Sequence, residues 1–356
     1  MRVGVIAPPW LVPATSYGGV ENAIDTVCRG LAMLGNDVFL WAAEGSTCPV
    51  NTSGSQAATD NAAAWHSAPE EADHVLKGYE WLDGHAVDVV EDHTYLGPLI
   101  GSLLTRAPVV AVNSLPFTSP HRKGSHPDLS RIYAEAARRA HVVAISADQA
   151  TGATAPVAAV LHHGTGFVEE TARLQARSPD PDSYAAVLGR MSPDKGIVES
   201  IRAGLYAGLG VRIAARMEEP REFAYFHDQV APLVDGDRVT YLGCLGRAKR
   251  DSFLAEAACL INLAQWPEPF GLVTIESMAV GTPVVATRVG AAPELITPGV
   301  TGFLVESELD AAEAVAECES LDRSAVYHEA RRQFSATACA RRRMTFYSEI
   351  LKGAHS

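Results

Sequence analysis

Apolar runs of strand length alternate with helix-like segments along nearly the whole chain. The segments between the runs, such as 20–34 and 70–82, carry apolar residues at the spacing of amphipathic helices. Such alternation is typical of parallel sheets with helices on both faces, so we predict an α/β fold. The predicted strands are residues 3–7, 38–43, 87–91, 108–112, 142–145, 157–161, 184–188, 211–214, 239–242, 260–263, 283–286 and 303–305.

The alternation is interrupted at residues 164–183, where glycine, serine and proline favour a linker. A chain of 356 residues is long enough for two domains. We therefore predict two doubly wound, Rossmann-like parallel-sheet domains that face a central cleft. The Ser/Ala/Asn-rich residues 47–64 are predicted to form a mobile surface loop. The predicted parts are an N-terminal domain (1–165), a linker (166–183), a C-terminal domain (184–335) and a C-terminal helix (336–356) that could pack back on the N-terminal domain.

Composition narrows the classes of function. A net charge of −13 and a pI near 5.4 argue against a nucleic-acid partner. No apolar run approaches the ~20 residues that cross a bilayer, and the first apolar run is too short for the core of a signal peptide. We therefore expect a cytoplasmic protein with no transmembrane segment. The six cysteines lack the paired spacing of zinc or redox sites, so we expect no metal.

Two acids, Glu268 and Glu276, flank the start of a predicted helix that follows an apolar strand. Backbone N–H groups of Phe270, Gly271 and Leu272 would point out of the helix N-terminus, where an anion is favoured. A carboxylate can accept hydrogen bonds from both hydroxyls of a sugar diol. An isolated Glu is more often a solvated surface acid, but this arrangement favours a clamp for a sugar nucleotide.

Two cations, Arg190 and Lys195, lie in the turn after the strand 184–188. Arg can bind phosphate oxygens as a fork, and Lys can bind them as a point charge. Fixed cations would stabilise the negative charge that develops on a diphosphate leaving group, without a metal. The alternative, a pair of solvated turn cations, carries about equal weight for these residues alone.

The N-terminal half has two further candidates. Gly18 and Gly19 precede a helix, where glycine lets the backbone approach a phosphate closely. No third glycine completes a dinucleotide fingerprint, so a flexible turn is the alternative. His93 lies at the carboxyl end of a strand, where ligands of such sheets bind. A capped, hydrogen-bonded histidine is the alternative there.

Together these motifs resemble the retaining glycosyltransferases of family 4, which have the GT-B fold. The two Glu with seven residues between them, 268 and 276, keep the Phe-Gly-Leu and Met-Ala contexts of that family. Further matches are Gly18-Gly19, Gly189-Arg190, Lys195-Gly196 and the segment 281–286. The resemblance is strong over 184–305 and moderate over 1–165.

The resemblance implies a role for each of these residues. Glu276 would hold the donor ribose, and Glu268 the transferred sugar. Arg190 and Lys195 would hold the diphosphate, and His93 would lie near the transferred sugar and the acceptor. The remaining donor contacts would come from Gly18, Gly19, Phe270, Gly271, Leu272 and Val273, with Tyr241 and Leu245 in the loop against which the nucleotide base rests.

The function implied is a metal-independent, retaining hexosyltransferase that needs no cofactor. Its donor would be a nucleoside-diphosphate sugar, UDP-glucose by default, bound by the C-terminal domain. The N-terminal domain would bind the acceptor, a small molecule, a lipid or a glycan. A sugar-nucleotide epimerase of similar fold and a nucleotide-sugar-binding protein without transfer remain alternatives. The chain departs from the family pattern at two places. His162-His163 leaves the conformation of the hinge open, and Arg216 leaves open whether it adds a phosphate contact or blocks one.

Overall fold

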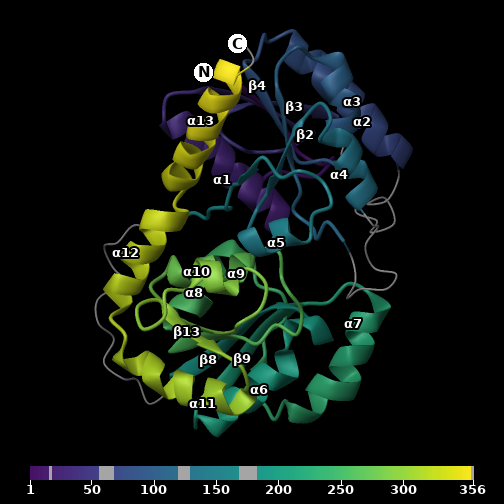
Figure 1. The fold of residues 1–356 in the computed structure, drawn as a ribbon. Helices are drawn as coiled ribbons and strands as arrows, with labels where there is room; N and C mark the ends of the chain where they lie inside the picture. The colour runs from purple at the N-terminus through teal and green to yellow at the C-terminus, as the bar shows by residue number, and fades with distance from the viewer. Residues whose placement is uncertain (16–17, 56–67, 119–128, 168–182, 354–356) are drawn as a thin grey trace. The chain divides into compact units, whose positions relative to one another are not determined.

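The computed structural model describes residues 1–15, 18–55, 68–118, 129–167 and 183–353, so most of the predicted linker lies outside it. The chain divides into two compact units. The first comprises Met1–Gly164 together with Ser335–Ser356, and the second is Thr165–Phe334. Each unit is an α/β fold around one parallel sheet (Figure 1), as the alternating pattern predicts.

In the first unit the strand order is β3-β2-β1-β4-β5-β6-β7, and all the pairings are parallel. The strands are β1 (Arg2–Ile6), β2 (Asp37–Ala43), β3 (Asn51–Ser55), β4 (Val89–Asp92), β5 (Val109–Val112), β6 (His141–Ala144) and β7 (Ala159–Val160). The helices are α1 (Gly19–Met33), α2 (Ala68–Asp83), α3 (Gly97–Leu104), α4 (Ser130–Ala136), α5 (Ala147–Thr151) and α13 (Ala336–Gly353).

Strand β3 corrects the prediction of a surface loop over 47–64. Residues Asn51–Ser55 pair in parallel with β2 at the edge of the sheet, with Asn51 opposite Phe39. An edge strand needs only backbone hydrogen bonds on one side, so the polar sequence N-T-S-G-S gives no apolar signal for it. The remainder of the predicted loop from residue 56 lies outside the described residues.

In the second unit the strand order is β10-β9-β8-β11-β12-β13, again parallel throughout. The strands are β8 (Tyr184–Arg190), β9 (Gly210–Arg216), β10 (Val239–Tyr241), β11 (Cys259–Asn262), β12 (Val284–Thr287) and β13 (Gly302–Val305). The α-helices are α6 (Ile197–Tyr206), α7 (Pro220–Tyr225), α8 (Arg247–Glu256), α9 (Leu272–Met278), α10 (Ala292–Leu295), α11 (Glu308–Glu317) and α12 (Arg323–Phe334).

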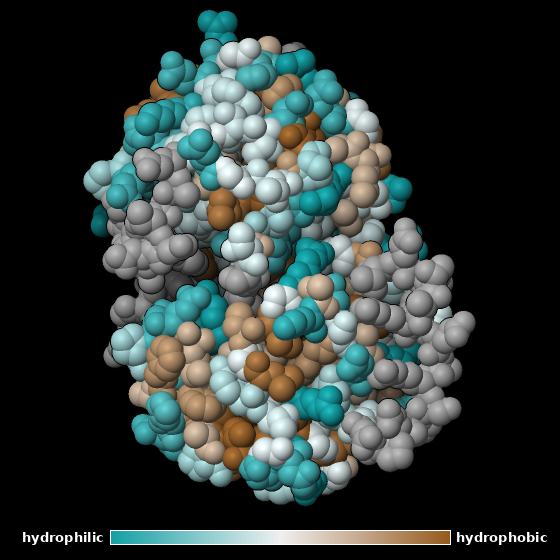
Figure 2. Space-filling view, turned by 180° about the vertical axis from the view of Figure 1, so that it is seen from behind, coloured by the Kyte–Doolittle hydropathy of each residue, from teal (hydrophilic) through white to brown (hydrophobic). Residues whose placement is uncertain are grey.

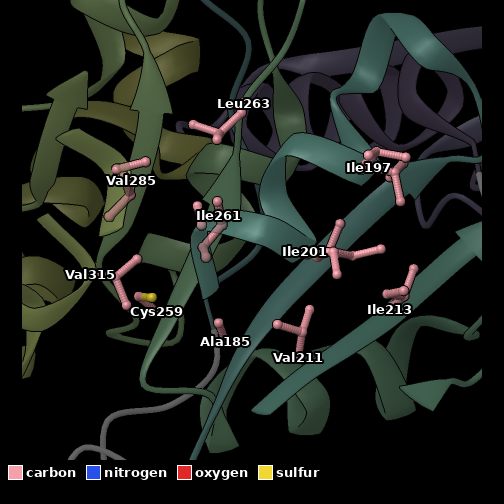
Figure 3. Close-up of a cluster of buried hydrophobic side chains, with 14 of the residues drawn as sticks. Ala185, Ile197, Ile201, Val211, Ile213, Cys259, Ile261, Leu263, Val285 and Val315 are labelled. Carbon is pink, nitrogen blue, oxygen red and sulfur yellow. The ribbon is translucent and has the colours of Figure 1, made fainter. Parts of the chain in front are cut away.

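One hydrophobic cluster of the second unit lies between its sheet and two helices, α6 and α11 (Figure 3). Alternate residues of a strand point to the same face of a sheet. Val211 and Ile213 of β9 and Cys259 and Ile261 of β11 therefore share one face, where Ile201 of α6 packs against them. This packing holds β8, β9 and β11 rigidly and so fixes where the loops after them begin.

Both sheets contain a topological switch point, because the first strand of each unit lies inside its sheet and the chain builds outward in both directions. The switch lies between β1 and β4 in the first unit and between β8 and β11 in the second. Loops that follow such a strand pair diverge and leave a crevice, where ligands of open α/β sheets bind. The predicted residues Gly18, His93, Lys195 and Glu268 all lie in loops at these two points or at the helix start that follows them.

The surface carries no described helix with the length and apolar character that crossing a bilayer requires. On the face drawn in Figure 2, hydrophilic and hydrophobic residues are interspersed over the surface. The most exposed large apolar side chains, Met33, Tyr206 and Leu309, come from three different helices. Single exposed apolar residues of this kind are ordinary for a folded domain.

Candidate active site

The loops after β8 and β11 are joined through their backbones. Gly196 has a φ of +62°, and a Cβ atom there would lie 1.7 Å from the carbonyl oxygen of Leu263. Only glycine tolerates both this conformation and this approach. The backbone N–H of Gln265 also donates to the carbonyl of Asp194 over 2.9 Å. The two loops of the switch point therefore form one connected surface.

On this surface the structure brings two of the predicted residues together. The Nζ of Lys195 contacts the Oε1 of Glu268, and it also lies 5.9 Å from the ring centre of Trp266. The backbone of Glu268 is fixed by its own carbonyl, which accepts a hydrogen bond of 3.0 Å from Ala291. The side chains of Lys195 and Glu268 are 13% and 19% exposed, so the ion pair remains accessible to a ligand.

Arg190 ends β8 and lies between two acids. Its Nη2 is 3.4 Å from Asp194 Oδ2, and its Nε is 3.5 Å from Glu222 Oε1. Arg216 is its partner in the register of β9, and it pairs with Glu218 over 3.0 Å. Two cations thus end neighbouring strands at the carboxyl edge of the sheet. Sequence reasoning missed the acids that hold them, Asp194, Glu218 and Glu222, because a single acid has no distinguishing pattern.

Glu276 lies on the second turn of α9, which begins after Gly271 at a φ of +91°. Its Oε1 is 3.1 Å from Nη2 of Arg250 on α8, and the two side chains are 14% and 4% exposed. Burial raises the pKa of Glu276, while Arg250 and Arg247 act in the opposite direction. Sequence reasoning missed Arg250, which lies on a basic helix that looks solvated.

Glu276 and Arg250 line a small recess within the second unit. The recess is formed by Thr165, Gly166, Arg247, Arg250, Asp251, Glu276, Ala279 and Val280. Arg190, Lys195 and Glu268 are not among these lining residues. Among the described residues, Lys195 therefore meets Glu268 at one place, and Glu276 meets Arg250 at another.

The predicted base-contacting stretch 241–245 begins at the last residue of β10. The hydroxyl of Tyr241 donates to the Ala215 carbonyl over 2.8 Å, and its ring centre is 4.9 Å from that of Phe226. Tyr241 thus packs within the unit. Leu242 and Cys244 are exposed and Leu245 is half-buried.

In the first unit, Gly18 and Gly19 start α1 as predicted for a helix N-terminus. A Cβ atom on Gly18 would lie 2.8 Å from Oε2 of Glu21, whose carboxylate therefore sits close to the helix start. A carboxylate in the first turn is stabilised by the helix dipole. Glu21 thus lies where the sequence predicts a phosphate.

His93 follows β4, where it belongs to a buried polar cluster that sequence reasoning missed. Its Nε2 lies 2.9 Å from Oε1 of Glu91, and both side chains are 0% exposed. Arg343 and Tyr347 of α13 contact the same carboxylate, with Arg343 Nε 3.0 Å from Oε2. Burial tends to raise the pKa of Glu91, but Arg343, His93 and Tyr347 outweigh burial and hold it below the ordinary value.

The His162-His163 departure from the family pattern contributes to the same cluster. The carbonyl of His162 accepts a hydrogen bond from Arg343 Nη1 over 3.2 Å. His163 is buried, and burial, followed by the nearby Arg343, lowers the pKa of this imidazole well below its ordinary value. His163 is therefore neutral at pH 7.

Comparison with known proteins agrees with this architecture. Residues 168–340 match the family described as "Glycosyl transferases group 1". A D-inositol 3-phosphate glycosyltransferase of Mycolicibacterium smegmatis is 32% identical over 143 residues, which are 38% of this chain and 32% of that protein. An N-acetyl-alpha-D-glucosaminyl L-malate synthase of Bacillus anthracis is 41% identical over 87 residues, which are 24% and 22% of the two chains. The matched segments span about a third or less of these relatives.

Solved structures align over nearly the whole chain. AviGT4, a glycosyltransferase involved in avilamycin A biosynthesis, has a TM-score of 0.72 at 22% identity and covers 99% of this chain and 98% of its own. Anabaena Alr3699/HepE in complex with UDP and glucose has a TM-score of 0.72 at 20% identity, with 98% and 99% covered. The chain therefore has the GT-B fold, and its residues 168–340 match the family described as glycosyl transferases group 1.

Proposed function

We propose that this protein is a retaining glycosyltransferase of family 4 that transfers a hexose from a nucleoside-diphosphate sugar to an acceptor. The observation that carries the proposal is the accessible contact between Lys195 and Glu268 at the switch point between β8 and β11. The names of the relatives and the UDP and glucose in the Alr3699/HepE structure support it. UDP-glucose is the donor to test first.

The ion pair between Lys195 and Glu268 would open when the donor binds. A partly exposed pair contributes only about 0–1 kcal/mol, so a ligand can replace it at little cost. The donor diphosphate would take over Lys195 as a charge partner, and Glu268 would then accept hydrogen bonds from hydroxyls of the transferred sugar. Arg190 would exchange its partners Asp194 and Glu222 for phosphate oxygens in the same way.

Transfer would proceed through loss of the diphosphate. As the bond between the anomeric carbon and the diphosphate oxygen breaks, Lys195 and Arg190 would stabilise the developing charge without a metal. The acceptor oxygen would attack on the face that the diphosphate leaves, which retains the anomeric configuration. The departing phosphate would take the acceptor's proton, and His93 would lie near the transferred sugar.

The recess around Glu276 would hold the nucleoside. Glu276 would accept the ribose hydroxyls, and Arg250 would favour the ionised form of this largely buried carboxylate. Backbone N–H groups of Phe270–Val273 would add phosphate contacts, and the loop 241–245 would support the base. The acceptor would be a small molecule, a lipid or a glycan.

The test is donor-dependent release of nucleoside diphosphate by the full chain with a panel of sugar acceptors. We expect Lys195→Ala and Glu268→Ala each to lower kcat by about 10²–10³-fold, because each removes a group aimed at the reacting diphosphate sugar. Lys352→Ala and Glu306→Ala, at exposed positions, are the matched controls and should retain the parental rate.

Equal rates in all four variants would contradict the proposal. Conversion of the donor without any acceptor would indicate the epimerase alternative. Nucleotide affinity without turnover on any acceptor would indicate a binding protein. Because Lys195 and Glu268 are partly exposed, their variants should fold, and circular dichroism checks this directly.

A further inference from the structure

One arginine of helix α8 is buried, although it follows a stretch of exposed basic residues. Arg247 and Lys249 are exposed, whereas the side chain of Arg250 is only 4% exposed. Arg250 lies one turn before Leu254, on the buried face of the helix. Burying a charge costs free energy, so the position of Arg250 calls for a physical reason.

The partner of Arg250 is Glu276 of α9, a helix that packs beside α8 (Figure 1). Arg250 Nη2 is 3.1 Å from Glu276 Oε1. Ile275 and Ser277, on either side of Glu276, are 0% exposed. The Ser277 hydroxyl also donates to the Thr282 carbonyl over 3.0 Å. Helix α9 is therefore seated in the unit, and it presents Glu276 to Arg250 from a fixed backbone.

Stability does not account for this ion pair. Replacing a buried ion pair by apolar residues of similar volume is often neutral or stabilising, so such a pair is a poor way to hold two helices together. The Nε of Arg250 is also buried and has no hydrogen-bond partner among the residues that the structure describes, which adds to the cost. The effect of Arg250 on Glu276 explains the arginine better than packing does.

The carboxylate of this pair is open to a ligand. Arg250 and Glu276 both line the recess of the second unit, and the Glu276 side chain is 14% exposed. An ionised carboxylate has about four lone-pair sites, so the contact with Arg250 leaves acceptor capacity for two hydroxyl groups. A ribose presents two neighbouring hydroxyls. The recess thus offers an oriented acceptor to a sugar diol.

The charges around Glu276 act on its ionisation in both directions. Burial raises the pKa of this carboxyl, Arg250 and Arg247 lower it, and Asp251 raises it. The other residues that line the recess carry no charge: Thr165, Gly166, Ala279 and Val280. Loss of Arg250 would therefore favour the protonated carboxyl, which carries an O–H donor and accepts fewer hydrogen bonds.

We propose that Arg250 is a positioning residue that acts through Glu276: it holds this carboxylate as an oriented acceptor in the recess, so that the protein selects nucleotides with an intact ribose diol over their deoxy forms. The inference rests on the proposed function, because it takes the ribose of the donor as the occupant of the recess. It adds a residue on a different helix that determines which nucleotides bind.

The test compares UDP with 2′-deoxy-UDP by calorimetric titration of the full chain. We expect the parent to bind UDP about tenfold more tightly, because the deoxy form leaves Glu276 without one of its hydroxyl partners. Arg250→Met has a side chain of similar volume without charge, and it should reduce this preference to about twofold or less. Arg250→Lys keeps the positive charge and should retain most of the preference. Lys249→Met, at an exposed neighbouring position, is the matched control and should behave as the parent does.

A double-mutant cycle shows whether Arg250 acts through Glu276. Glu276→Gln alone should also weaken the preference for UDP, because an amide has only one acceptor oxygen. Adding Arg250→Met to Glu276→Gln should then change the ratio of the two affinities little further. Additive losses would mean that Arg250 acts on the nucleotide independently, and they would overturn the positioning role. The double variant leaves neither charge buried without its partner, so it should fold even where Arg250→Met alone does not.

The kinetics of sugar transfer provide a readout that a loss of stability does not imitate. The ribose is remote from the bond that breaks, so Arg250→Met should raise the KM for the donor about tenfold and leave kcat within about threefold. Lys195→Ala, which removes a charge from the reacting diphosphate, should instead lower kcat. A fall in kcat without a change in KM for Arg250→Met would contradict the inference.

The outcomes separate this inference from the proposed function. A parental preference for UDP in Arg250→Met would overturn the positioning role, and so would a parent that transfers sugar but binds both nucleotides equally. Absence of both nucleotide binding and transfer in the parent would refute the proposed function. In that case ¹³C NMR of labelled glutamate, with Glu276 assigned by Glu276→Gln, still tests the pair. Arg250→Met should raise the pH at which Glu276 is protonated, and an unchanged titration would overturn the role of Arg250.

Discussion

The two switch points hold their charges in opposite ways. In the second unit, Lys195 and Glu268 pair across two neighbouring loops and remain 13% and 19% exposed. In the first unit, Glu91 and Arg343 pair across 252 residues and are 0% exposed. A partly exposed pair can exchange partners at low cost, whereas a buried pair cannot be separated without a large penalty. We infer that the Lys195–Glu268 pair changes its partners when a ligand binds, whereas the Glu91–Arg343 pair stays fixed.

Breaking each pair should therefore have very different effects on stability. Arg343→Gln leaves Glu91 buried without its charge partner, and we expect it to lower the free energy of unfolding by about 3–5 kcal/mol. Lys195→Gln should lower it by about 1 kcal/mol or less. Urea unfolding followed by circular dichroism measures both. Equal losses in the two variants would remove the distinction between the sites.

The connection between the β8 and β11 loops should depend on Gly196. In Gly196→Ala the Cβ atom would lie 1.7 Å from the Leu263 carbonyl, so the backbone must move. Gly208 also has a positive φ, of +84°, but nothing lies within 4 Å of its Cβ position. We expect Gly208→Ala to cost about 1–2 kcal/mol from backbone strain alone. Gly196→Ala should lower the free energy of unfolding by clearly more than Gly208→Ala, and it should also weaken nucleotide binding. Equal losses of stability in the two variants would mean that the loops are not joined at Gly196.

Acid should affect the two buried carboxylates in opposite directions. The pKa of Glu91 is held below its ordinary value, so the stability it contributes is complete above about pH 4.5 and is lost as the pH falls below that. The pKa of Glu276 is raised, so its ionisation costs stability above its folded value, and this cost disappears as the pH falls. Thermal unfolding from pH 3.5 to 7 should show that Glu91→Gln flattens the acid-side loss. Glu276→Gln should not flatten it, and identical pH profiles for the two variants would contradict these assignments.

Removal of divalent metal ions with EDTA should have the smallest effect on the rate of transfer. If Lys195 and Arg190 supply the positive charge for the leaving diphosphate, EDTA should leave the rate of transfer within about twofold of its value in untreated enzyme. A rate that falls severalfold with EDTA and returns with Mg²⁺ or Mn²⁺ would show that a metal shares this role. Lys195→Ala measured in the same buffer provides the reference for a lost charge.

The parts of the fold that are visible in the sequence are those set by local pattern. Most strands of both sheets are buried apolar runs, and Gly271 marks the start of α9, so these elements follow from neighbouring residues. Strand β3 is polar and lies at an edge, where backbone pairing alone defines it. The pattern of side chains therefore carries no sign of it.

In the candidate site, too, some contacts can be predicted from the sequence and others cannot. Glu268 and Lys195 lie in loops after neighbouring strands, so sheet topology brings them together and the sequence predicts both. Arg250 reaches Glu276 from a different helix, and Arg343 reaches Glu91 from the other end of the chain. Those two contacts depend on how helices pack, which a single sequence does not reveal.

The most direct test of the account is a calorimetric titration of UDP into the parent, Lys195→Ala and Lys352→Ala. We expect Lys195→Ala to bind UDP about 10–100-fold more weakly than the parent, because a charge-assisted hydrogen bond to phosphate is lost. Lys352→Ala, at an exposed position on α13, should bind as the parent does. Equal affinity in all three proteins would show that the diphosphate does not bind at the β8–β11 switch point.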